Sequence, residues 1–112
     1  MSGEERGKEL KAELERIVGV LERRVRPEKV ILFGSLASGR LRPESDIDLL
    51  IVQDSQETIF ERVKRLESIL ERRYAADLIV LTPKEVQTLL DSDNRYLKDI
   101  FSRGKVLYER AT

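Results

Sequence analysis

Two short motifs, with ten residues between them, contain the side chains best suited to chemistry. Gly34-Ser35 follows one apolar run, and Asp46-Ile47-Asp48 opens another. Side chains alternate faces along a strand, so Asp46 and Asp48 are expected to point the same way, with Ile47 opposite them. Two carboxylates at the start of a buried strand repel each other and lose hydration, which is costly unless cations lie between them. The pattern predicts a divalent-metal site facing a phosphate-holding turn.

Together these motifs resemble the sequence signature of the nucleotidyltransferase superfamily that includes DNA polymerase beta. Within it, they resemble the minimal nucleotidyltransferase (MNT) branch. In that family Gly-Ser, ten residues and Asp-x-Asp lie on a strand–turn–strand unit, and another carboxylate lies on a later strand. Asp77, in the apolar run 76–81, fits that place. The resemblance is closest over residues 30–52 and extends loosely to residue 81. It implies the nucleotidyltransferase fold, with a mixed sheet that has three strands at its core.

The resemblance also implies roles for these residues in moving AMP from ATP to a hydroxyl. Asp46 and Asp48 would bridge two Mg²⁺ ions, for which Mn²⁺ can substitute. Asp77 would complete the metal nearer the acceptor and help to take its proton. Gly34 and Ser35 would hold the β- and γ-phosphates at a helix start.

Further nucleotide contacts are assigned to Ser45 and Arg40. Many MNT sequences carry Arg directly after the Ala of the turn, where this chain has Ser38. Arg40 and Arg42 are close enough in sequence to substitute for that cation. Solvated loop arginines are an equally good interpretation of both residues.

MNT proteins of this size often accompany a HEPN-type RNase toxin and silence it by transferring AMP to a toxin tyrosine. The resemblance therefore implies an antitoxin that forms a hetero-oligomer with such a toxin. Two alternatives stay open. One is a catalytically silent antitoxin that neutralises its partner by binding alone, and the other is a nucleotidyltransferase that acts on a small hydroxylated molecule.

Composition excludes several other classes of protein. The 112-residue chain contains no histidine and no cysteine, so histidine-based nucleophile systems, imidazole metal sites, disulfides and thiolate zinc sites are ruled out. The remaining oxygen ligands favour hard ions such as Mg²⁺. With 21 basic and 21 acidic residues the net charge is zero, which argues against direct binding of long nucleic acid. We expect a cytoplasmic protein with no signal peptide and no membrane segment.

Two phosphate or metal motifs fail on inspection. Gly34 and Gly39 have the spacing of a Walker A loop, but Arg40 and Leu41 stand where that loop needs Lys and then Ser or Thr. An EF-hand that begins at Asp46 would need glycine at its sixth position, where this chain has Ile51.

Apolar periodicity predicts one α/β (α+β) domain over residues 1–112, with a small mixed sheet flanked by helices in the order αβαβαβα. Residues 35–39 are expected to form a short helical turn, with Ser35 near its N-cap and Gly39 at its end. The longer helices are expected over residues 5–25, 56–73 and from 83 onward, and the strands over residues 29–34, 46–53 and 76–81, with a possible short strand at 106–108.

The apolar stretch near the C-terminus allows two interpretations. Tyr96, Leu97, Ile100 and Phe101 recur at helical spacing. They pack onto the sheet as core, or part of the stretch forms a surface for a partner.

Overall fold

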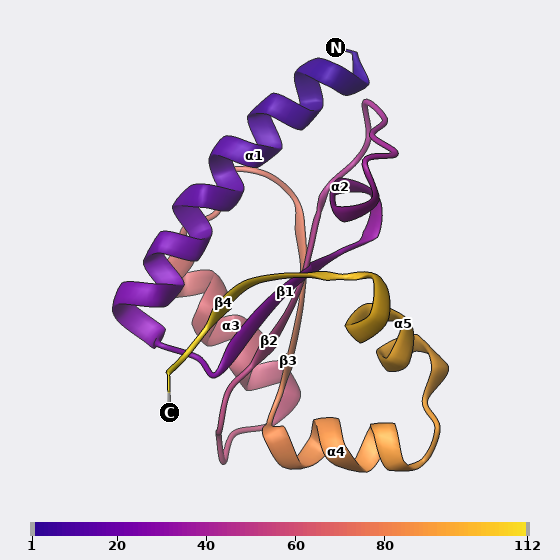
Figure 1. Cartoon of the computed structure of the whole chain (residues 1–112). Helices are drawn as coiled ribbons and strands as arrows, with labels where there is room; N and C mark the ends of the chain where they lie inside the picture. The colour runs from indigo at the N-terminus through magenta and orange to yellow at the C-terminus, as the bar shows by residue number, and fades with distance from the viewer. Residues whose placement is uncertain (1, 112) are drawn as a thin grey trace.

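A four-stranded sheet in the order β3-β2-β1-β4 lies at the centre of the computed structural model, which describes residues 2–111 (Figure 1). β1 (Lys29–Phe33) is antiparallel to both of its neighbours, β2 (Ile47–Val52) and β4 (Lys105–Glu109). β3 (Ala76–Leu81) is parallel to β2 and forms one edge. The small mixed sheet is as predicted, and β4 is the short C-terminal strand.

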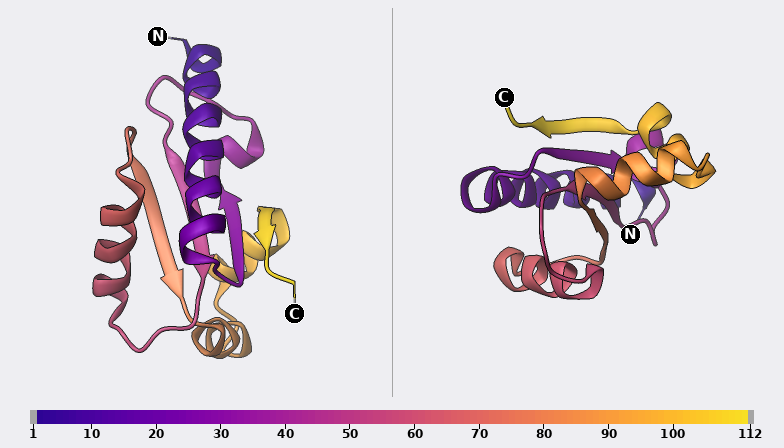
Figure 2. Two further views of the ribbon diagram at one scale, coloured as in Figure 1. Left: turned by 90° about the vertical axis from the view of Figure 1, so that its left-hand side faces the viewer. Right: turned by 90° about the horizontal axis from the view of Figure 1, so that it is seen from below.

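Helices cover both faces of this sheet, so the molecule has three layers (Figure 2). Two core clusters separate the layers, one between the sheet and α1 with α3, and one between the sheet and α4 with α5. A short helix, α2, connects β1 to the loop before β2. The helices are α1 (Gly3–Val20), α2 (Gly34–Ser38), α3 (Ile59–Leu70), α4 (Pro83–Asp91) and α5 (Arg95–Arg103).

The alternation of side chains along β2 decides which layer the candidate site faces. Ile47, Leu49 and Ile51 pack with α1 and α3, whereas Leu50 and Val52 belong to the cluster beneath α4 and α5. Residues two apart on a strand share a face, so Asp48 lies on the α4–α5 side of the sheet. The N-terminal end of β2, which carries Asp48, therefore faces α5.

Two helices differ in their bounds from the sequence prediction for local reasons. The helix expected over residues 56–73 spans Ile59–Leu70, because Thr58 forms a capping box with Glu61 and Glu71 takes a left-handed φ of 45°. The first helix begins earlier than predicted, at Gly3, because the Ser2 side chain caps it by accepting from the Glu5 amide. Its last turn, η1 (Leu21–Val25), widens into a π-helix.

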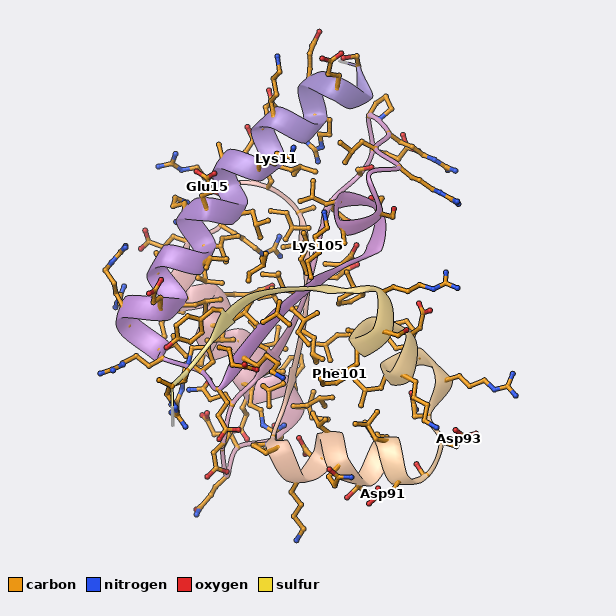
Figure 3. The ribbon with its side chains drawn as sticks, in the orientation of Figure 1. Lys11, Glu15, Asp91, Asp93, Phe101 and Lys105 are labelled. Atoms are coloured by element: carbon orange, nitrogen blue, oxygen red, sulfur yellow. The ribbon has the colours of Figure 1, made fainter. Side chains whose placement is uncertain are left out.

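The C-terminal apolar stretch is mainly core. Leu97 and Ile100 of α5 are both 3% exposed and pack on the sheet, as the core interpretation predicts. Phe101 lies between α5 and the sheet (Figure 3), where the Lys29 ammonium is 5.8 Å from the centre of its ring. Tyr96 is different, because 61% of it is exposed.

Within residues 2–111, none of the helices combines the length and apolar character needed to cross a membrane.

Candidate active site

Strand register brings the three predicted carboxylates together. β2 and β3 are parallel with Asp48 directly beside Asp77, and Asp46 immediately precedes β2. One carboxylate oxygen from each of the three residues lies within 4.8 Å of the others. Asp46 and Asp48 are partly buried, and Asp77 is exposed on the edge strand. The structure thus forms an oxygen-only donor cluster at one end of the sheet.

The Gly-Ser turn lies against this cluster because of the antiparallel register between β1 and β2. Phe33 is the strand partner of Asp48, so Gly34 follows directly beside that carboxylate. Gly34 has a left-handed φ of 76°, and a Cβ added to it would lie 2.2 Å from Oδ2 of Asp48. Only glycine fits both the backbone conformation and the space. Phe33 occupies the cap position of α2, so Ser35 is the second helical residue and not its cap.

A hydrogen-bond network anchors Ser35 to the loop that carries the acids. The Ser35 hydroxyl donates to the Ser45 hydroxyl at 3.1 Å, and the Arg42 amide donates to that same Ser45 oxygen at 2.8 Å. The Arg6 guanidinium on α1 donates to the Ser45 carbonyl, also at 2.8 Å. Ser45 is only 7% exposed. It therefore fixes the distance between the turn and Asp46.

The cluster is electrostatically unfavourable for three charged carboxylates. Burial, followed by the charges of Asp46 and Asp77 and a hydrogen bond with Asp77, raises the pKa of Asp48 to about 6. Each of these causes penalises the ionised form, and a cation among the oxygens would reverse the effect of the two charges. Clustered carboxylate oxygens are the donor set that Mg²⁺ and Mn²⁺ prefer. The residues present therefore fit a hard divalent ion.

A cavity of about 620 Å³ adjoins the cluster and the turn. Arg40 lines it from the loop, whereas Arg42 contributes its backbone amide to the Ser45 network. The opposite wall is α5, which contributes Asp99 and Arg103, two residues that sequence analysis missed. Their spacing places them on one helix face, but no local pattern reveals against which end of a sheet a helix packs. The residues that line the cavity are Phe33, Gly34, Ala37, Ser38, Arg40, Asp48, Tyr96, Asp99, Ile100 and Arg103.

A family model described as polymerase beta nucleotidyltransferase matches residues 15–112. The chain belongs to this nucleotidyltransferase family. A relative from Methanocaldococcus jannaschii, provisionally named a protein adenylyltransferase, is 34% identical over 85 residues, which are 76% of this chain and 82% of the relative. The resemblance identified from the Gly-Ser and Asp-x-Asp motifs is confirmed, and the chain is a transferase by family.

Solved structures agree on the fold. A provisionally named nucleotidyltransferase from Sulfolobus solfataricus superposes with a TM-score of 0.67 at 26% identity, covering 98% of this chain and 89% of that one. A toxin–antitoxin structure with AMP-PNP superposes with a TM-score of 0.53 over 86% of this chain and 73% of that one. Its sequence identity is 21%, so that likeness concerns the fold alone.

Replacing Gly34 by alanine is expected to damage the site, whereas Gly39→Ala should not. Both glycines are left-handed, with φ of 76° and 82°, so each alanine costs roughly 1–2 kcal/mol of stability. Only at position 34 does the new Cβ collide with Asp48, since no atom of residues 2–111, apart from Gly39 itself and its chain neighbours, lies within 4 Å of a Cβ at position 39. Calorimetric titration with Mn²⁺ should show a loss of affinity of about tenfold or more for Gly34→Ala alone. Equal affinities in the two variants would contradict this geometry.

Without divalent ions, stability should fall between pH 4 and pH 6 because of Asp48. Its pKa is about 6 when folded, and about 3.9 in an unfolded chain, so rising pH ionises the unfolded form first and favours it. The loss in the free energy of unfolding is at most about 3 kcal/mol, and solvent screening of this partly exposed group makes it smaller. Asp48→Asn should remove this decline and stabilise the metal-free protein at pH 7. Chemical denaturation at a series of pH values measures this decline, and Asp54→Asn, in an exposed loop, is the control. An unchanged decline in Asp48→Asn would refute its assignment to Asp48.

Proposed function

We propose that this chain transfers AMP from ATP to a hydroxyl group of a partner protein, with tyrosine as the acceptor residue. The observation that carries the proposal is the cluster of Asp46, Asp48 and Asp77, whose oxygens lie within 4.8 Å of one another, beside Gly34. The name of the M. jannaschii relative supports protein adenylylation. A toxin–antitoxin structure with AMP-PNP shares the fold, which supports a toxin as the partner. The resemblance to MNT proteins implies that this toxin is of the HEPN type.

Asp46, Asp48 and Asp77 would hold two Mg²⁺ ions, or Mn²⁺ in their place. When bound between carboxylates, such ions neutralise charge on the attacking and leaving oxygens of phosphoryl transfer. Positive charge among the carboxylates would also relieve their mutual repulsion, which, after burial, raises the pKa of Asp48.

The residues of the turn bind and orient the nucleotide. Gly34 lets the backbone approach the phosphates, and the Ser35 hydroxyl, held by Ser45, helps to grip them. Arg40, which lines the adjoining cavity, offers a cation to the phosphate chain. Once the nucleotide is aligned, the acceptor oxygen bonds to the α-phosphorus and the bond to pyrophosphate breaks. Such reactions depend on positioning and electrostatics, which this small protein can supply.

Asp77 has the position that a protein acceptor requires. It is the exposed member of the cluster and lies on β3, at the open edge of the sheet. A flexible segment from a partner can therefore bring a tyrosine hydroxyl to it from solvent. There Asp77 would accept the hydroxyl proton as the oxygen attacks.

Asp46→Asn should abolish transfer while leaving the fold intact. Removing one carboxylate charge from the cluster should slow transfer by about 100-fold or more, a loss typical of an essential electrostatic group. The measurement is the intact mass of a candidate HEPN-type partner after incubation with the protein, ATP and Mg²⁺. Wild type and the exposed-loop control Asp54→Asn should add one or more AMP units.

The outcomes separate the competing functions. Wild-type transfer by Asp46→Asn would refute the catalytic assignment. Absence of transfer by wild type and by Asp46→Asn, with the partner still neutralised, would favour a silent antitoxin that acts by contact. Absence of any complex with HEPN-type partners, together with adenylylation of small hydroxylated compounds, would move the acceptor to a small molecule.

A further inference from the structure

One face of α5 forms a wall of the cavity next to the carboxylate cluster. Tyr96, Asp99 and Arg103 all line this cavity together with Gly34 and Asp48. Their separations of three and four residues place them in one row along the helix. Seven residues at 1.5 Å per residue make this row about 10 Å long. The row is therefore long enough to contact two different parts of one nucleotide.

Arg103 is a cation whose ion pair with Asp99 is exposed and weak. Its Nε donates to Oδ1 of Asp99 at 3.0 Å, but the two side chains are 83% and 60% exposed. An exposed pair of this kind contributes less than about 1 kcal/mol, so a phosphate can displace the carboxylate at little cost. The planar guanidinium then offers two parallel donors to phosphate oxygens.

Tyr96 supplies a flat apolar surface at the other end of the row. Its ring meets that of Phe33 edge to face, with centroids 6.1 Å apart and an angle of 86° between the planes. This contact holds the ring while 61% of the residue stays exposed. Stacking of a base on an exposed aromatic face contributes about 1–3 kcal/mol and is possible for every base.

We propose that α5 forms the second wall of the nucleotide site, with Arg103 contacting the phosphates and Tyr96 stacking on the base. The proposal rests on the function proposed above and extends the site from the Gly-Ser turn to a helix some sixty residues later in the chain. It assigns substrate-binding roles to side chains that the Gly-Ser and Asp-x-Asp motifs do not include. It also supplies Arg103 as a second cation, in addition to Arg40, in the cavity that Ser38 lines.

Binding of a non-hydrolysable ATP analogue and of inorganic tripolyphosphate, both with Mg²⁺, tests the two contacts separately. Arg103→Gln should weaken both ligands about tenfold or more, and Arg103→Lys should do so less, because it keeps the charge but loses the paired donors. Tyr96→Leu should weaken the analogue and leave tripolyphosphate unchanged. Arg95→Gln, an exposed arginine on the same helix that does not line the cavity, is the matched control and should bind both like wild type.

Wild-type affinity of Arg103→Gln for tripolyphosphate would overturn the phosphate contact. Equal weakening of both ligands in Tyr96→Leu would overturn the base contact. Either result, together with Mg²⁺-dependent AMP transfer by the wild type, leaves the proposed function intact. A wild-type protein that binds neither ligand would overturn both proposals. Thermal unfolding of each variant confirms that a loss of affinity comes from a folded protein.

Discussion

The repulsion among three carboxylates at one corner of the sheet is the constraint on which the rest of the structure depends. Burial and two neighbouring charges hold the pKa of Asp48 near 6, so the metal-free protein retains an unfavourable arrangement at neutral pH. Such an arrangement persists only where the surrounding structure fixes it, and it is typical of sites that bind cations. The fold provides this support through a strand register, a glycine and a buried serine.

Each support comes from a different level of structure. The parallel register of β2 and β3 places Asp48 beside Asp77, and the antiparallel register of β1 brings Gly34 against the same carboxylate. Ser45 then ties the turn to the loop before β2, and Arg6 secures that loop to α1. A site held by a sheet and its first connections needs no additional domain for rigidity. The open side toward α5 and the edge strand remain free for nucleotide and acceptor.

Local signals predicted the residues of the cluster better than the cavity around it. Two acids at a strand start and a glycine after a strand are local patterns, and their positions follow from the period of a β-strand. The ends of the first and third helices were less predictable, since they depend on caps and left-handed residues such as Glu71. Arg103 could not be found from sequence, because its place in the cavity depends on how α5 packs against the sheet. Tyr96 was recognised as part of an apolar row, but its exposure required the structure.

The most direct test of the carboxylate cluster as a metal centre is the anomalous scattering of Mn²⁺ in a crystal grown with a non-hydrolysable ATP analogue. We expect two manganese peaks bridged by Asp46 and Asp48, one of them also bound to Asp77, with the phosphate chain beside Gly34 and Ser35. Manganese bound elsewhere on the protein, or a nucleotide seated away from the Gly-Ser turn, would contradict this expectation.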